Sequence, residues 1–268
     1  MSTQTRDSRR RAGVRGPATA GAALVAAAAL LGPIPHASAA TDDKAVAVAE
    51  RVMDALGGEA AWKRTRFLRF DFAVDRGGAT LVRRAHTWDK WTGRYRAEAK
   101  DEKGRPVVVL MNLKTREGRA WVDGKPANGR ELAALLESGY AWWVNDAYWL
   151  LMPYKMRDPG VSLSWVREDK KDAGTRDVVL LTFDGVGLTP KDRYWVFVDR
   201  ETGLVDRWEF VLKGAKADPT PYDWKGWKSY GNIRLADDRV NPKDGTRIHF
   251  PVLEVPGSVA DSVFTTPE

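Results

Sequence analysis

The chain of 268 residues contains no cysteine. This absence excludes disulfide bonds, thiolate metal sites and lipid attachment at a cysteine. Histidine is almost as scarce, because the chain has three in all and only His86 and His249 lie beyond residue 39. Neither belongs to an H-E-x-x-H pattern, so we expect no metal site. Stability must therefore come from a packed core, and residues 40–268 are enough to build one.

The sequence also lacks the short motifs that mark common catalytic and cofactor sites. It has no G-x-S-x-G elbow, no G-x-G-x-x-G after a strand pattern and no G-x-x-x-x-G-K-[ST] loop. Glycoside hydrolysis would need two carboxylates at a fixed separation, and Asp146, Asp158, Asp184 and Asp223 do not establish such a pair. We therefore expect neither catalysis nor a bound cofactor.

The first 39 residues have the three-part pattern of a secretory signal peptide. Five arginines and one acidic residue lie within Met1–Arg15, an apolar run follows from Ala18 to Leu31, and small residues close the segment at Ala37–Ala39. The apolar run has about 14 residues, whereas a membrane-spanning helix needs roughly 20. We therefore expect export by the general or the twin-arginine route, with cleavage before Ala40 and a periplasmic or secreted location.

Cleavage would change the meaning of the net charge. The whole chain has 43 basic and 36 acidic residues, for a net charge of +7. Without residues 1–39 it keeps 38 basic and 35 acidic residues, for a net charge of +3. Charges of both signs are interleaved, as in Glu168–Asp172, which is typical of a solvated surface. We therefore expect no nucleic-acid partner.

Hydrophobic periodicity predicts a helix and then a series of strands in the first half. Residues 42–56 have apolar residues at helical spacing, with Thr41 or Asp42 as the N-cap and two glycines at 57–58 as the end. A short helical turn around Trp62 follows. The spacing then changes to two, which predicts strands over 68–74, 81–88, 94–99, 107–113 and 119–122.

The middle of the chain returns to a helical pattern. We expect Asn128 to cap a helix over 129–138, Gly139 to separate it from a second helix, and Pro153 to end the helical stretch. Six more strands are predicted, over 161–166, 178–183, 194–198, 205–212, 229–235 and 246–255. Because most links are short turns, the strands should pair antiparallel. The predicted fold is α+β, with residues 40–268 forming one domain in which about eleven strands make a large, curved antiparallel sheet covered by helices.

All twelve tryptophans lie after residue 39, and several interpretations of them stay open. They could fill a core between the sheet and its helices, or some of them could line a cavity for an apolar guest. A third interpretation is an exposed platform that stacks on sugars, for which Trp224 and Trp227 are the candidates. The densest aromatic segment is 140–161, where a helix that is apolar on nearly all sides should be buried or should cover an opening. Asp146 within it needs polar partners, and we expect backbone N–H groups, or an arginine or lysine such as Lys155 or Arg157, to provide them.

Part of this segment resembles a string found in an uncharacterised family of exported bacterial proteins. The residues concerned are Asn145-Asp146, Tyr148–Leu150, Met152-Pro153, Lys155 and Asp158–Val161. The order of elements also resembles the lipoprotein-localisation fold of LolA and LolB, as does the hairpin Trp195–Val205. The resemblance implies an eleven-stranded half-barrel that is covered by helices and holds acyl chains in its hollow.

These observations lead to one main hypothesis and two alternatives. The main hypothesis is an exported protein that binds an apolar small molecule or lipid, with a lipoprotein as a further partner implied by the resemblance and peripheral membrane contact allowed. The residues expected on the binding surface are Phe70, Phe72, Trp88, Trp121, Trp142, Trp143, Tyr148, Trp149 and Trp195. The alternatives are a carbohydrate- or cell-wall-binding module that uses 221–230, and a domain that docks on another protein. Neither alternative needs a cavity.

Overall fold

The computed structural model describes residues 42–171, 174–185 and 188–268. The predicted signal peptide and Thr41 lie outside these residues. The helices are α1 (Asp43–Ala55), α2 (Gly58–Arg64), α3 (Gly129–Leu151) and the 3-10 helices η1 (Met152–Lys155) and η2 (Asp261–Phe264). The strands are β1 (Phe67–Arg76), β2 (Ala79–Asp89), β3 (Arg94–Lys100), β4 (Pro106–Asn112), β5 (Gly118–Val122), β6 (Lys125–Pro126), β7 (Val161–Lys171), β8 (Gly174–Phe183), β9 (Arg193–Asp199), β10 (Val205–Val211), β11 (Thr220–Tyr230), β12 (Ile233–Val240), β13 (Arg247–His249) and β14 (Leu253–Glu254).

All fourteen strands belong to one antiparallel sheet, which confirms the predicted fold class. Strands β6 to β1 run in order from one edge, and β13 to β7 continue from β1 to the other edge. The two halves meet where β1 pairs with β13, with Val74 opposite Ile248. The end strands β6 and β7 are not paired with each other, so the sheet is open.

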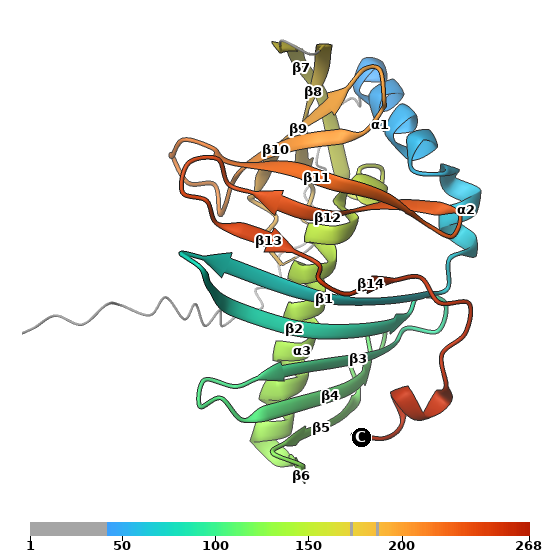
Figure 1. Ribbon diagram of the computed structural model, residues 1–268, viewed down its shortest axis with the longest axis vertical. Helices are drawn as coiled ribbons and strands as arrows, with labels where there is room; N and C mark the ends of the chain where they lie inside the picture. Colours follow the sequence, from blue (N-terminus) through green and yellow to red (C-terminus); the bar gives the residue numbers. More distant parts are fainter. Residues whose placement is uncertain (1–41, 172–173, 186–187) are drawn as a thin grey trace, which may run out of the picture. The chain divides into compact units, whose positions relative to one another are not determined.

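This strand order makes α3 the bridge between the two edges of the sheet. The helix follows β6 and precedes η1 and β7, so the chain crosses the full width of the sheet along α3 (Figure 1). Thirteen neighbouring strands would span roughly 58 Å if flat, at about 4.8 Å per strand. A helix of 23 residues is only about 35 Å long. A curved sheet brings the two edges within reach of the helix and its short flanking segments.

The core lies between α3 and the sheet. We call the side of the sheet that packs against α3 the covered face, and the opposite side the outer face. Side chains of β3, β4 and β5 form a smaller apolar cluster with the N-terminal half of α3. The other strands form a larger cluster with α1, η1 and the C-terminal half of α3. Trp88 and Trp143 pack against both clusters and so lie at the seam between them.

Helix α1 is fixed to the second half of the sheet by two carboxylates. Its N-cap, Asp42, accepts hydrogen bonds from the backbone N–H of Lys44 (2.9 Å) and of Trp165 in the edge strand β7 (2.8 Å). Asp177 accepts from Arg51 of α1 at 2.6 Å and from Arg200 at 2.7 Å. Burial alone would raise the pKa of Asp177, but its hydrogen bonds outweigh burial and lower that pKa to about 2. Both carboxylates therefore remain ionised at neutral pH.

The expectation that Gly139 separates two helices is wrong, because α3 is continuous from Gly129 to Leu151. A Cβ atom at position 139 would lie 2.9 Å from Val109 Cγ1 and 3.3 Å from Val109 Cβ. Gly139 is thus the point where α3 approaches β4 most tightly, rather than a break. Asn128 does occupy the N-cap position, but its side chain makes no capping hydrogen bond. Pro153 follows the end of α3, as predicted.

Two predicted strands are also corrected. The strand expected over 229–235 runs across a hairpin turn, since β11 ends at Tyr230 and β12 begins at Ile233. The strand expected over 246–255 is interrupted, because Phe250–Val252 separate β13 from β14. Each of these errors hides one strand, and the short β6 was not predicted, which together account for fourteen strands instead of about eleven. In the described residues, no helix has both the length and the apolar character that a membrane span requires.

Replacing Gly139 with leucine should lower the free energy of unfolding by about 1–3 kcal/mol. The added side chain would meet Val109 at the tightest contact between α3 and the sheet. Urea denaturation followed by far-UV circular dichroism measures the change.

The matched control is Ala134→Leu, which places the same side chain at an exposed position of the same helix. It should change the free energy of unfolding by less than about 0.5 kcal/mol. Equal effects of the two substitutions would contradict the close approach at Gly139.

Candidate functional site

A buried ion pair joins α3 to β2 at the middle of the covered face. Arg84 donates from Nε to Asp146 Oδ2 at 2.6 Å and from Nη2 to Oδ1 at 2.7 Å. The Asp146 side chain is fully buried, and that of Arg84 is 18% exposed. Such a two-pronged contact uses one edge of the guanidinium and is stronger and more directional than a single hydrogen bond.

The ion pair continues into a buried chain of hydrogen bonds. His86 Nε2 lies 2.9 Å from Asp146 Oδ2, and His86 Nδ1 lies 2.6 Å from the hydroxyl of Tyr95. Both contacts are satisfied when Nε2–H donates to the carboxylate and the Tyr95 hydroxyl donates to Nδ1. Burial would raise the pKa of Asp146, but the hydrogen bonds from Arg84 and His86 outweigh burial and lower it. Burial, and then the charge of Asp146, raise the pKa of Tyr95 well above its usual value.

The expectation that an arginine or lysine pairs with Asp146 is confirmed by Arg84, but the two basic residues named as examples are not its partners. Lys155 pairs with Asp158, and Arg157 donates to Glu50 of α1 at 2.8 Å. Both basic residues lie beyond the end of α3, whereas Asp146 faces the sheet from within the helix. Asn145 beside it donates to Oδ1 at 2.8 Å, and its partners across the interface, Arg84 and His86, come from β2, 62 and 60 residues away in the sequence.

Aromatic rings from α3 and from four strands form a continuous wall at the C-terminal half of the helix. The ring of Trp149 lies 4.5 Å from that of Trp208 and 4.9 Å from that of Tyr222. Tyr148 lies 5.4 Å from Tyr194. The rings in contact here come from α3, β8, β9, β10 and β11, and they are Tyr148, Trp149, Phe183, Tyr194, Trp208, Phe210, Tyr222 and Trp224.

The structure brings together seven of the nine residues expected on the binding surface. Phe70 and Phe72 are buried on the covered face, and the indole ring of Trp88 lies there 5.4 Å from that of Trp143. The other residues of this group are on α3, and they are Trp142, Trp143, Tyr148 and Trp149.

Trp121 and Trp195 do not belong to this group, so their expected placement on the covered face is wrong. In β5 the covered face takes Ala120 and Val122, and alternation turns Trp121 to the outer face, where Arg119 lies over its ring at 5.4 Å. In β9 the same rule turns Trp195 outward, beside Arg193 at 5.5 Å.

The structure also removes the sugar-stacking site expected at Trp224 and Trp227. Trp224 is buried on the covered face, and its ring lies 6.0 Å from that of Trp227, which is partly buried. The indole N–H of Trp227 donates to the Val205 carbonyl at 2.9 Å. Trp224 is therefore not accessible for stacking on a sugar, and Trp227 alone does not make the expected pair.

Two arginines of the covered face were missed by sequence reasoning. Arg84, His86 and Trp88 are spaced two residues apart in β2, so strand alternation could have placed the charge of Arg84 on the same face as Trp88. Arg239 of β12 lies opposite Trp224 of β11, and its side chain is fully buried. Because the predicted strand ended at Leu235, the pattern assigned no face to Arg239.

The interior contains hydrogen-bond donors that have no acceptor. Every buried side-chain polar atom without a partner in the described residues is a nitrogen. Six of them come from covered-face or α3 side chains, namely Nε1 of Trp88, Trp143, Trp208 and Trp224, and Nε and Nη2 of Arg239. A buried donor without an acceptor costs free energy. The space between α3 and the sheet is thus apolar in its walls and short of acceptor oxygens.

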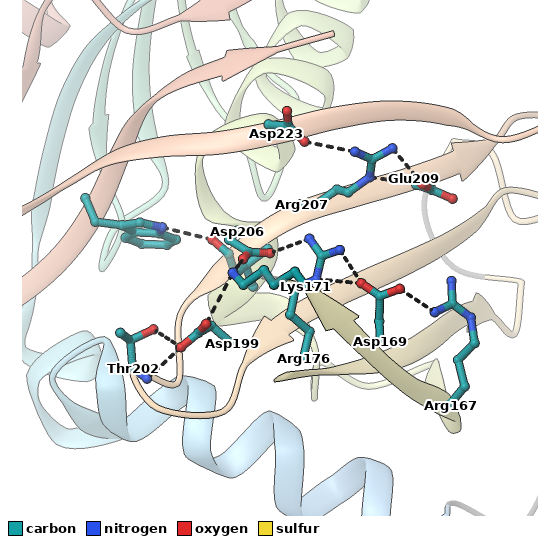
Figure 2. A network of polar contacts seen from close by, with 12 residues as sticks. Arg167, Asp169, Lys171, Arg176, Asp199, Thr202, Asp206, Arg207, Glu209 and Asp223 are labelled. Carbon is teal, nitrogen blue, oxygen red and sulfur yellow. Dashed lines mark hydrogen bonds and ion pairs between the residues drawn. The ribbon is translucent and has the colours of Figure 1, made fainter. Parts of the chain in front are cut away.

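The outer face of β7 to β11 is covered instead by a network of charges, which Figure 2 shows. Arg167 donates to Asp169, Arg176 to Asp206, and Arg207 to Asp223, at 2.8, 3.2 and 3.1 Å. The three guanidiniums lie within 6 Å of the buried ring of Phe197. Since each charge already has a partner, this network acts as a solvated cover of the sheet.

Side chains of α3 pack directly against those of the covered face. The two best-formed pockets of the described residues have volumes of about 230 and 220 Å³. The first lies beside Phe264 and the second beside Leu212, so neither is between α3 and the covered face. The second pocket is lined by Phe210 and so reaches one end of the aromatic wall, whereas a guest between α3 and the covered face would have to displace the side chains packed there.

Comparisons with known proteins give structural neighbours only. No protein-family model and no curated protein sequence matches the chain. A LolA superfamily protein from Nitrosomonas europaea is 11% identical, with a TM-score of 0.48 over 83% of this chain and 97% of that one. A DUF1329 family protein from Desulfovibrio piger is 13% identical, with a TM-score of 0.47 over 82% and 96%. A putative outer membrane lipoprotein-sorting protein domain from Vibrio parahaemolyticus is 9% identical, with a TM-score of 0.46 over 83% and 96%. At these values, function has to be argued from the chain's own residues.

Asp146→Asn and Arg84→Met should each lower the free energy of unfolding by about 3 kcal/mol. Each change leaves the remaining partner of a buried pair without its counter-charge. The double variant Arg84→Met/Asp146→Asn should lose less than the sum of the two single changes, with a coupling of at least about 1 kcal/mol. Urea denaturation of the four proteins completes the cycle.

Arg83 and Asp71 provide the control, because they form a 2.8 Å ion pair between β2 and β1 in which Arg83 is 61% exposed. Asp71→Asn should cost less than about 1 kcal/mol. A cost for Asp146→Asn no greater than that for Asp71→Asn would show that the buried pair does not hold α3.

Proposed function

We propose that this protein is exported and binds an apolar ligand, a lipid or an acyl-bearing partner, between α3 and the covered face. The observation that carries the proposal is the set of unpaired interior donors set in apolar walls beneath a single helix. An acyl ligand brings what this space lacks, because its ester or carboxyl oxygens accept hydrogen bonds while its chain packs against the rings.

The apolar part of such a ligand supplies the driving force. Leaving water contributes about 0.8 kcal/mol for each CH₂ group, so a chain of about 16 carbons gains on the order of 10 kcal/mol. The aromatic wall from Tyr148 and Trp149 to Trp208 and Trp224 is the surface that would receive it.

The cost of binding is the displacement of α3. Breaking the Arg84–Asp146 pair costs roughly 3–5 kcal/mol, which is less than the gain from burying a long chain. The ligand would also replace apolar contacts that the helix gives up. A short or polar guest could not supply this free energy, so the arrangement favours long acyl chains.

Export is the part of the proposal that rests on the sequence alone. The basic start, the short apolar run and the small residues before Ala40 support a cleaved signal peptide. This location, periplasmic or secreted, is one in which the protein would encounter lipids outside the cytoplasm.

A reversible cross-link tests whether the ligand enters beneath α3. In Val109→Cys/Gly139→Cys, the two Cβ atoms would start about 3.3 Å apart, which is close to the 3.5–4.5 Å of a disulfide. Replacing Val109 also removes the methyl group that crowds position 139. Since the natural chain has no cysteine, no other disulfide can form within it.

Native mass spectrometry with oleate and with phosphatidylglycerol should show binding to the reduced variant and to the natural protein, and none to the oxidised variant. Reduction of the same sample should restore binding. The single variant Val109→Cys is the control for the substitution itself. Absence of binding to the natural protein would overturn the proposed function, and equal binding to the oxidised and reduced forms would overturn the site.

A further inference from the structure

We infer that Arg239 pairs with the head group of the ligand, and that the ligand is therefore an anionic amphiphile with a carboxylate or phosphate head. This inference rests on the proposed function. It adds the charge class of the ligand and the residue that selects it.

Arg239 is an isolated cation at the centre of the covered face. Its side chain is fully buried, and its strand partners are Trp224 on one side and Ile248 on the other. No ion pair found in the described part of the chain includes it. The adjacent carboxylates already have partners, since Asp237 pairs with Lys228 and Asp238 accepts from Arg247 at 2.7 Å.

Two aromatic rings lie beside the guanidinium of Arg239, but two of its nitrogens have no hydrogen-bond acceptor. The group lies 4.0 Å from the ring centre of Trp224 and 4.8 Å from that of Phe250. The faces of these rings attract the cation but do not supply an acceptor oxygen. Nη1 donates to the Ala236 carbonyl at 2.7 Å, while Nε and Nη2 have no acceptor.

The two unpaired nitrogens of Arg239 form the edge with which other arginines of this protein bind carboxylates. Arg84 uses Nε and Nη2 to bind both oxygens of Asp146. Arg66 uses the same two nitrogens to bind Asp89, at 3.2 and 2.9 Å. An anion with two acceptor oxygens would therefore accept hydrogen bonds from Nε and Nη2 of Arg239, as Asp146 does from the same atoms of Arg84.

Burial adds an electrostatic reason for an anion at this point. Desolvation lowers the pKa of Arg239 to about 9, and the charges of Asp237 and Asp238 only partly oppose that effect. At neutral pH the group is still a cation, held away from water without a direct counter-charge. A bound anion supplies that charge where the dielectric screening is weak.

The position of Arg239 also fits the path of an acyl chain. From Arg239 the contacts lead to Trp224, then to Trp208 at 5.4 Å, and then to Trp149 of α3 at 4.5 Å. A head group at Arg239 would thus place the chain along the aromatic wall and beneath the C-terminal half of α3.

Matched pairs of ligands separate the head-group interaction from binding itself. The natural protein and Arg239→Met are titrated with oleate and methyl oleate, which share one chain and differ in charge. Phosphatidylglycerol and diolein form the second pair, and a preference within one pair or the other tells a carboxylate source from a phosphate source. Native mass spectrometry gives the bound fractions.

The natural protein should bind the anionic member of at least one pair about 10- to 100-fold more tightly than the neutral member. Arg239→Met should lose this preference but still bind the neutral ligand. Because it removes a buried charge without a partner, this substitution should not lower stability. Arg239→Lys keeps the charge but not the two-pronged edge, and should show an intermediate preference. It also serves as the test protein if Arg239→Met does not fold.

Arg69→Met is the control, because it removes a 58% exposed arginine from the outer face and should leave the preference unchanged. If the natural protein binds neither member of either pair, the proposed function fails. If it binds all four ligands but Arg239→Met keeps the same preference, or if no preference exists, binding stands and the role of Arg239 is overturned.

Discussion

The connection between the two edges of the sheet is a single helix, and the chemistry of the covered face follows from that constraint. Because β6 and β7 are at opposite edges, α3 has to cross the sheet, and it cannot leave the covered face without separating from both edges. Its central anchors are the contact of Gly139 with Val109 and the pair between Asp146 and Arg84. Under the proposed function, α3 would have to give up these central contacts to admit a ligand.

The two buried arginines of the covered face show two ways of placing a charge in an apolar interior. Arg84 has its counter-charge within the chain, so it contributes to the closed arrangement of α3. Arg239 has aromatic rings on its faces and no carboxylate on its edge. An unpaired buried cation lowers stability, and a site that must accept an anion has to carry this cost in its free state. The outer face, where every charge of the network has a partner, shows that the chain has carboxylates in plenty to pair with arginine.

Local sequence signals predicted most helices and strands, but they did not predict contacts between residues that are distant in the sequence. The helix over 42–56 and the hairpin at residues 77–78 were predictable because caps, glycines and periodicity act over a few residues. The role of Gly139 could not be predicted, because a glycine within a helical pattern indicates a helix end unless its contact with Val109 of β4 is known. The partners of Asp146 lie 60 and 62 residues away, and Arg239 lies beyond the strand that the pattern identified. Trp121 and Trp195 were misplaced because alternation separates the two faces of a strand but does not say which face is covered.

The central claim is that a ligand lies between α3 and the sheet and lifts the helix. The most direct test is a distance between two spin labels, one at Glu137→Cys on the exposed side of α3 and one at Arg69→Cys on the outer face of β1. The absence of natural cysteines allows both sites to be labelled without other changes. Pulsed electron paramagnetic resonance should show a longer distance when oleate or phosphatidylglycerol is bound than in the free protein. An unchanged distance in a protein that demonstrably holds the ligand would contradict the account.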